Sequence, residues 1–402
     1  MEKEKLIIKN FGPIKNVELE LGRFNVLIGE QATGKTMIGK ILCCCRYFSY
    51  IIQNDHDHQP FERGLESWGL AESIRDNTFI YYECFHYSLK IERKEAEFIN
   101  RDQDDGNEFE ERVPIFFSEL NAKSKEFDNL LAELEKIKPN TSNPFDTFDW
   151  IIPTSFFLND VAPVMNNPLF IPTERGLQSI FSLGKNSISN IDDSLFNQFA
   201  KVDQIQRHFK TETIIEPFGI EYKNENGYGS FRKPGDSVWY KMGSAPSGYQ
   251  TTIPIVLALK YYGEDKKGKS LVIDEPEISL FPSAQNNLVK FIANEFNTYN
   301  GFFFITTHSP YILTSLNNLI YAYQIGQKDK DKVNEIIEER YWINPTDISA
   351  YLLKYDLEAN GVIQEDLLDK EGLIKAEKID SVSAILNSDF NAIMDIELNI
   401  QK

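Results

Sequence analysis

Cysteine and histidine are scarce in this sequence, and long apolar runs are missing. The 402 residues include 4 cysteines and 5 histidines. Cys43, Cys44 and Cys45 are consecutive on a predicted helix, so their side chains point in different directions and cannot share one metal ion or one disulfide. Cys84 stands alone. The sequence therefore indicates neither a disulfide framework nor a cysteine metal site, and we expect the three neighbouring cysteines to be buried.

The chain also lacks the segments that direct proteins to membranes or out of the cell. No apolar run is long enough to cross a bilayer. The opening residues Met1 to Lys5 are mostly charged and do not form a signal peptide. With 42% hydrophobic and 26% charged residues, the composition is that of a globular protein. We therefore expect a cytoplasmic protein that has no membrane partner.

Basic residues are in the minority. The chain has 42 Lys and Arg against 61 Asp and Glu, which gives a formal net charge of −19. A charge of this sign repels nucleic acid on average, although it leaves room for a local basic patch. The charge balance therefore disfavours a dedicated DNA- or RNA-binding protein.

The rest of the chain is organised around one stretch near the N-terminus. The apolar run Phe24–Ile28 leads into a glycine-bounded loop and then into a predicted helix. The loop matches G-x-x-x-x-G-K-T, the phosphate-binding loop, whose backbone N–H groups surround a polyphosphate. In this motif Lys35 reaches the β- and γ-phosphates of ATP, and the Thr36 hydroxyl binds Mg²⁺. The candidate nucleotide-binding residues are Gly29, Glu30, Gln31, Ala32, Thr33, Gly34, Lys35 and Thr36.

Polar side chains also follow two later apolar runs. Ser270–Ile273 leads into Asp274 and Glu275, and Phe302–Thr307 leads into His308. If the strands are parallel, these groups meet the phosphate loop at one edge of a sheet. There Asp274 can hold Mg²⁺, and Glu275 can orient or deprotonate a water molecule. A surface acidic turn is the alternative for Asp274 and Glu275, and a structural role is the alternative for His308.

Periodicity predicts the remaining elements. We expect strands within 5–28 and a strand pair in 78–92. We expect a helix over 177–212, a β-hairpin in 213–242 and a further strand at 319–323, with helix patterns in the tail. Residues 94–140 are charged and have apolar residues at helical spacing. We therefore expect 94–165 to form a helical insertion, which is either a partner-binding arm or a cap on its own domain. The loop with His56 and His58 is expected to be solvated rather than a metal site.

Taken together, these motifs resemble the ABC-type ATPases of the SMC/RecF/OLD group, whose small prokaryotic members are often described as AAA-family ATPases. The resemblance covers about 1–50 and 165–320. It implies an α/β fold, an ABC-type P-loop ATPase head with a mixed sheet and flanking helices. The predicted units are an ATPase lobe at 1–93, the insertion at 94–165, the remaining core at 166–317, and a small C-terminal α/β extension at 318–402.

The resemblance also implies a role for each matching residue. Lys35 and Thr36 belong to the Walker A motif, Asp274 is the Mg²⁺ ligand and Glu275 the catalytic carboxylate, and His308 matches the switch histidine. Ser247, Gly248 and Gln250 match the signature motif, which in this family reaches the nucleotide of the opposite subunit. Two composite sites would then form in a head-to-tail homodimer or a higher homo-oligomer. The turn at 172–175 stands where the family has its Q-loop.

Three functions follow from the resemblance. The first is an ATP-driven dimerisation switch that controls a separate effector, a nuclease or toxin of an anti-phage defence system. The second is a RecF-like DNA-repair ATPase, which the charge of −19 disfavours. The third is an OLD-like nuclease, which needs a glutamate and an Asp-x-Asp after the histidine, and 311–402 shows neither convincingly. The first is the function we expect.

Overall fold

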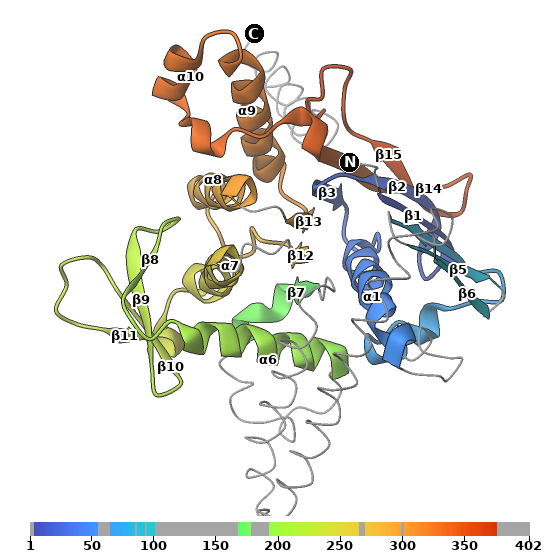
Figure 1. Ribbon diagram of the computed structural model, residues 1–402, viewed down its shortest axis with the longest axis horizontal. Helices are drawn as coiled ribbons and strands as arrows, with labels where there is room; N and C mark the ends of the chain where they lie inside the picture. Colours follow the sequence, from blue (N-terminus) through green and yellow to red (C-terminus); the bar gives the residue numbers. More distant parts are fainter. Residues whose placement is uncertain are drawn as a thin grey trace, which may run out of the picture.

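The computed structural model describes residues 4–54, 65–84, 87–92, 95–100, 168–177, 193–264, 270–298 and 301–375. Within these ranges the strands form an 11-stranded sheet and a separate four-stranded sheet, with helices packed on both faces of the larger one (Figure 1). This confirms the predicted α/β class with a mixed sheet and flanking helices. The expected metal-free loop at His56 and His58 lies outside the described residues.

One half of the large sheet is parallel. Its order is β7 (Leu169–Ile171), β12 (Ser270–Asp274), β13 (Phe302–Thr307), β3 (Phe24–Gly29) and β14 (Ile348–Asp356). Because neighbouring strands run in the same direction, their carboxyl ends meet at one edge. That edge receives the phosphate loop from β3, the acidic pair from β12 and the histidine from β13.

The other half is mainly antiparallel. It contains β15 (Gly361–Asp366), β2 (Ile14–Leu21), β1 (Glu4–Phe11), β4 (Phe79–Glu83), β5 (Tyr87–Glu92) and β6 (Glu95–Asn100). The strands expected in 5–28 and 78–92 are therefore confirmed. In contrast, the expected helical insertion is wrong at its start. Residues Glu95–Asn100 form β6, because their backbone pairs with β5 along all six residues. The rest of the expected insertion, from 101 to 165, lies outside the described residues.

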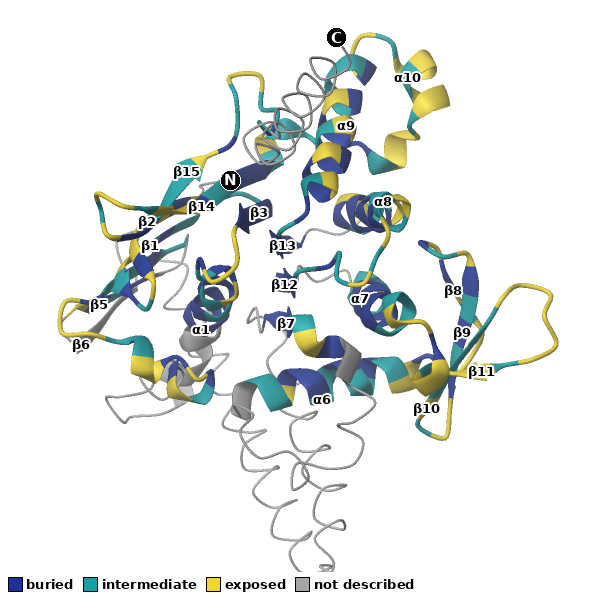
Figure 2. Cartoon of the chain, turned by 180° about the vertical axis from the view of Figure 1, so that it is seen from behind, coloured by how far each residue is buried: buried dark blue, intermediate teal, exposed yellow. Residues whose placement is uncertain are grey.

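Helices bury both faces of the parallel half. Helix α1 (Lys35–Asn54) covers one face, and α7 (Ser247–Glu264), α8 (Pro282–Thr298) and α9 (Pro310–Gly326) cover the other (Figures 1 and 2). Along β3, Phe24, Val26 and Ile28 join the apolar cluster under α7–α9, and Leu27 joins the cluster under α1. The three cysteines of α1 are buried in that second cluster, as expected. Burial on both faces explains why the strand is apolar apart from Asn25, whose side chain donates to the carbonyl oxygens of Gly22 and Phe303.

The chain between α6 (Asp193–His208) and α7 forms a small antiparallel sheet. Its strands are β8 (Thr213–Ile215), β9 (Ile220–Glu225), β10 (Tyr228–Arg232) and β11 (Tyr240–Lys241), in the order β11-β10-β9-β8. It projects beside α7 at the left of Figure 1. The hairpin expected in 213–242 is confirmed. The helix expected over 177–212 is confirmed for Asp193–His208, whereas residues 209–212 are not helical.

The strand expected at 319–323 is wrong, because these residues belong to α9. A strand would place Leu319 and Tyr321 on the same face, but Leu319 is buried whereas Tyr321 is 55% exposed. Leu316, Leu319 and Ile320 are all buried and follow the three- and four-residue spacing of a helix. Helical periodicity therefore outweighs the strand-like composition of this run. The shorter α10 (Lys330–Ile336) follows.

Strands β14 and β15 of the C-terminal extension belong to the large sheet. Strand β14 pairs with β3 in parallel, with Leu353 opposite Gly29, and β15 continues the sheet to β2. The chain thus returns from its C-terminal part to join the N-terminal strands. The helix patterns expected in the tail hold for α9 and α10 but not for β14 and β15.

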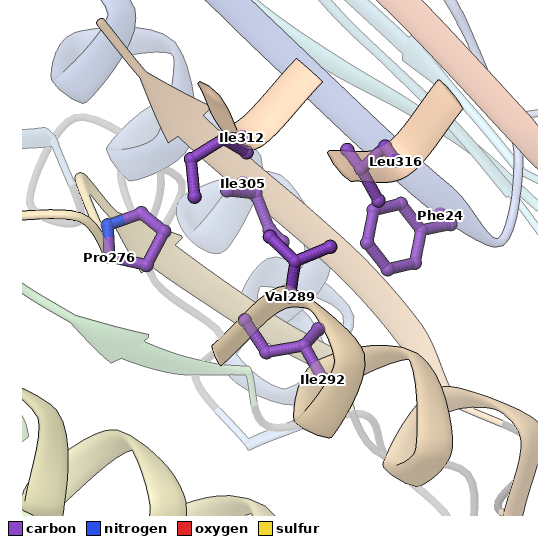
Figure 3. A pocket seen from close by; sticks show the side chains of 7 residues that line it. All are labelled: Phe24, Pro276, Val289, Ile292, Ile305, Ile312 and Leu316. Atoms are coloured by element: carbon purple, nitrogen blue, oxygen red, sulfur yellow. The ribbon is translucent and has the colours of Figure 1, made fainter. Parts of the chain in front are cut away.

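A small apolar gap remains between the large sheet and its helices (Figure 3). Carbon atoms line it, and it has no room for a water molecule; its lining residues are Phe24, Pro276, Val289, Ile292, Ile305, Ile312 and Leu316. It is a packing gap in the core rather than a ligand site. Among the helices that the structure describes, none is both long and apolar enough to span a membrane.

The return of the C-terminal strands can be tested at Gly22, in the turn between β2 and β3. A methyl group there would lie 2.6 Å from the carbonyl oxygen of Asp347, just before β14. We expect Gly22→Ala to lower the free energy of unfolding by about 1–3 kcal/mol, because the backbones must separate. Urea denaturation measures this. Gly243→Ala is the control, since no atom lies within 4 Å of its added methyl group; equal stability of both variants would contradict the close contact.

Candidate active site at the carboxyl edge of the parallel strands

The phosphate loop connects β3 to α1, as the sequence predicts. Ala32 and Gly34 have left-handed backbone conformations, with φ of 61° and 88°. A methyl group on Gly29 would lie 2.5 Å from the carbonyl oxygen of Leu353 in β14. Inside the loop, the Thr33 hydroxyl donates a hydrogen bond to the carbonyl oxygen of Glu30. The glycine at the start of the loop is therefore required by the strand next to it, and the loop forms a compact cradle before the helix.

Lys35 lies folded against this loop. Its Nζ donates to the carbonyl oxygens of Gly29 and Glu30, each at 2.9 Å, and lies 3.5 Å from Nδ1 of His308. Burial lowers the pKa of Lys35, and the carboxylates of Glu275 and Asp274 partly oppose this effect. The ammonium group is thus held at the phosphate loop by backbone oxygens, which a phosphate group could replace as acceptors.

Asp274, at the end of β12, gathers hydroxyl groups from three parts of the chain. Thr36 donates to its carboxylate at 2.9 Å, Thr173 at 2.5 Å and Thr306 at 2.5 Å. The residue is 1% exposed. The hydroxyl of Thr36 and the carboxylate of Asp274 are the two side-chain ligands expected for Mg²⁺, and the structure places them in direct contact. Oxygen donors of this kind fit a hard divalent cation that completes its shell with phosphate oxygens and water.

Glu275 and His308 form a pair beside Asp274. His308 Nε2 lies 2.7 Å from Glu275 Oε1, and its other ring nitrogen faces Lys35. Glu275 has a φ of 47°, which is unfavourable for a residue with a side chain, and its N–H donates to both the carbonyl and the hydroxyl of Thr306. The bend at the strand end directs the two successive acids, Asp274 and Glu275, to different partners. The structure thus brings together the five predicted residues Lys35, Thr36, Asp274, Glu275 and His308.

The turn at 172–175 contributes two residues that sequence reasoning did not assign. Thr173, rather than the exposed Glu174, contacts Asp274. Arg175 is completely buried, and its guanidinium donates to the carbonyl oxygens of Pro172, Thr251, Asp274 and Glu275. Burial lowers the pKa of Arg175 to about 10. The position of the turn was a signal, but nothing in the sequence shows that this arginine points inward.

Arg175 joins three parts of the site. Its bond to Thr251 reaches α7, while its bonds to Asp274 and Glu275 reach the end of β12. The five donors of a guanidinium allow one side chain to satisfy several backbone carbonyls at once. The geometry of the acidic strand end therefore depends on the first turns of α7.

The predicted signature residues lie at the start of α7. This end of the helix packs against the loop that follows β12. A methyl group on Gly248 would lie 3.0 Å from the carbonyl oxygen of Ser279, and Gln250 donates to the carbonyl oxygen of Ala245. Over the described ranges, no hydrogen bond joins Ser247, Gly248 or Gln250 to the phosphate loop. These three residues are thus not part of the cluster formed by the other five.

Within the described residues, no separate cluster of metal-binding side chains competes with this site. Across the parts of the chain that the structure describes, no group of three or more His, Cys, Asp or Glu residues could hold a metal ion. The Mg²⁺ site expected here has one protein carboxylate and one hydroxyl, so it needs oxygens from the nucleotide. With so few protein ligands, we expect the metal ion to bind together with the nucleotide.

Three solved structures of SMC head domains resemble the fold. The first is the "SMC head domain from Thermotoga maritima", with 11% identity, 91% of this chain and 99% of that chain covered, and a TM-score of 0.40. An "SmcHead bound to the C-winged helix domain of ScpA" has 9% identity, coverages of 91% and 98%, and a TM-score of 0.44. The Pyrococcus furiosus Smc head domain with an extended coiled coil, bound to the C-terminal domain of ScpA, has 11% identity, coverages of 95% and 99%, and a TM-score of 0.41.

The family assignment depends on sequence instead of on these distant structures. No curated protein is detectably similar to the chain. The family model described as "AAA ATPase domain" matches residues 73–313, which is more than half of the chain. The matched range begins after the phosphate loop and includes Asp274, Glu275 and His308. The chain therefore belongs to the AAA ATPase domain family, and its activity is the hydrolysis of ATP.

Proposed function

We propose that ATP is bound and hydrolysed at the carboxyl edge of β3, β12 and β13. The observation that carries this proposal is the continuous set of contacts from Thr36 to Asp274 and from Glu275 through His308 to Lys35. The phosphate loop and the acidic strand end, distant in the sequence, form one site. Its charged groups match the parts that phosphoryl transfer to water requires.

Each side chain has a distinct role in this proposal. The loop from Gly29 to Thr36 binds the phosphates through its N–H groups, and Lys35 exchanges its backbone acceptors for phosphate oxygens. Thr36 and Asp274 hold Mg²⁺, which when bound neutralises charge on the phosphates. Glu275 accepts a proton from the attacking water. His308 stabilises negative charge as it develops.

The signature residues support a nucleotide-dependent dimer. Ser247 and Gly248 begin the long helix α7, and a helix N-terminus of this kind attracts phosphate. Because they have no hydrogen bond to the phosphate loop of their own chain, we assign them to the nucleotide of a second copy. ATP then joins two chains, and its hydrolysis releases them.

We further propose that this switch acts on a separate effector protein, a nuclease or toxin in anti-phage defence. Between residues 311 and 375, the described chain consists of α9, α10 and two strands of the ATPase sheet. This stretch thus supports the ATPase rather than forming a nuclease fold of its own. The net charge of −19 disfavours the alternative of a RecF-like DNA-binding ATPase.

The role of Lys35 predicts a binding defect. We expect Lys35→Ala to weaken ATP binding about 100-fold or more, because the phosphates lose their principal cationic partner. Fluorescence titration with a labelled ATP analogue measures this. Lys40→Ala, on the same helix, is the matched control, since Lys40 donates to the carbonyl oxygen of Trp68 away from the loop. Equal affinities for both variants would remove Lys35 from the binding site.

The role of Glu275 predicts a defect in turnover without a loss of binding. We expect Glu275→Gln to lower kcat about 100-fold or more, because the amide cannot accept the proton of the attacking water. Phosphate release measures kcat, and the exposed Glu339→Gln is the control.

The same variant tests the dimer. We expect the Glu275→Gln chain to be monomeric alone and to form a dimer or larger assembly with Mg-ATP, as measured by light scattering after size exclusion. A mass that does not respond to Mg-ATP contradicts the dimerisation switch, whereas full turnover contradicts the role of Glu275.

A further inference from the structure

Glu277 is the one acid of the segment after β12 that the ATPase roles leave unassigned. It follows Asp274, Glu275 and Pro276, but its side chain turns toward β13. Its Oε1 accepts hydrogen bonds from the backbone N–H of His308 and from the Thr307 hydroxyl, each at 2.7 Å. Glu277 thus contacts the main chain of the histidine, while Glu275 contacts its ring.

Glu277 is half-buried, and its carboxyl group faces the protein. Its Oε2 is buried and has no hydrogen-bond partner in the described part of the chain. Burial raises the pKa of Glu277, and the bonds from His308 and Thr307 oppose the rise. Burial of a carboxyl group lowers the stability of a protein unless hydrogen bonds compensate for the lost water. The two donors in the segment 307–309, which we call the histidine loop, therefore stabilise Glu277 in this position.

The histidine loop is held at a second point. The Thr307 hydroxyl accepts from the N–H of Ser309, and the Ser309 hydroxyl donates at 2.5 Å to Gln285 of α8. Gln285 in turn donates to the carbonyl oxygen of Leu280, in the loop that packs against Gly248. Glu277 and Gln285 therefore hold the two sides of His308 between them.

Such anchoring matters because His308 has two partners. Its ring lies 2.7 Å from Glu275 and 3.5 Å from Lys35, so a small displacement of the loop changes both contacts. Glu275 and Glu277 are separated only by Pro276, whose ring restricts the backbone. The segment that carries the catalytic carboxylate thus also carries the group that places its histidine partner.

We propose that Glu277 is a positioning residue for ATP hydrolysis, which acts by holding the backbone of His308 through a hydrogen-bond acceptor. This inference depends on the proposed roles of Glu275 and His308. It assigns to Glu277 neither contact with the nucleotide nor transfer of a proton. What the position requires is an oxygen acceptor at the place of Oε1.

Two nearly isosteric substitutions of Glu277 distinguish the effect of losing the hydrogen-bond acceptor from the effect of changing the side-chain volume. Glu277→Met fills the same space without an acceptor, and Glu277→Gln keeps one. We expect Glu277→Met to lower kcat about 100-fold, as a misplaced catalytic group does, while the Kd for ATP stays within about threefold. Glu277→Gln should keep kcat within about fivefold of the unsubstituted chain. Glu295→Met is the matched control, because Glu295 is a half-buried acid on α8 whose partner is Asn294.

A double variant shows whether Glu277 acts through His308. If it does, Glu277→Met combined with His308→Ala loses no more activity than His308→Ala alone, because the group being positioned is already gone. If the fold-losses in kcat of the two single variants multiply in the double variant, the proposal is overturned. So would full turnover of Glu277→Met, or a Glu277→Gln variant as impaired as Glu277→Met, which would show that the charge is needed.

The outcome also separates this inference from the function on which it depends. A His308→Ala variant with full turnover contradicts the proposed role of His308 itself. An inactive His308→Ala beside a fully active Glu277→Met contradicts only the positioning role of Glu277. Circular dichroism confirms that each variant is folded, and if Glu277→Met does not fold, the result for Glu277→Gln decides whether the acceptor or the charge matters.

Discussion

The buried carboxylate of Asp274 is the interaction on which the arrangement of the site depends. It accepts hydroxyl groups from Thr36 after the phosphate loop, Thr173 after β7 and Thr306 in β13. A charge with 1% exposure is stable only if it is well hydrogen-bonded, so these partners hold three strand ends in register around it. The same geometry prepares an oxygen-lined position for a divalent cation, which links the stability of the site to the chemistry proposed for it.

A second buried charge connects this centre to the rest of the molecule. Arg175 has backbone carbonyls as partners, and they belong to its own turn, to Thr251 of α7 and to Asp274 and Glu275. Its bond to Thr251 joins the acidic strand end to α7, whose first residues we propose to contact the nucleotide of a second copy of the chain. Gln285 and Glu277 make the corresponding connection to the histidine loop. Side chains from separate loops thus bind the catalytic edge into one network, in which a change at one loop affects the others.

The two halves of the large sheet contribute differently to function. The parallel half supplies the catalytic groups, because its strands all end at the same edge. Strand β14, the member of the parallel half that adjoins the mainly antiparallel half, supports the phosphate loop from the other side of β3. The carbonyl oxygen of Leu353 in β14 lies so close to Gly29 that no side chain fits at this position. The C-terminal strands are therefore part of the ATPase even though they contribute no side chain to the proposed chemistry.

Local sequence determined the phosphate loop, the apolar strands that end in Asp274 and His308, and the α/β class, because each depends on short-range patterns of glycine, charge and apolar residues. Tertiary structure alone decided that β14 and β15 enter the sheet, that 319–323 is helical, and that Arg175 and Glu277 point inward. These features depend on contacts between distant residues. Pairing of β14 with β3 and of β15 with β14 and β2 selects the strands, and packing of Leu316 and Ile320 selects the helix. Backbone carbonyls of other segments accept from Arg175, and the His308 N–H and the Thr307 hydroxyl donate to Glu277. A polar residue in a turn looks alike in the sequence whether it faces water or the core, and only the folded chain provides the partners that decide between them.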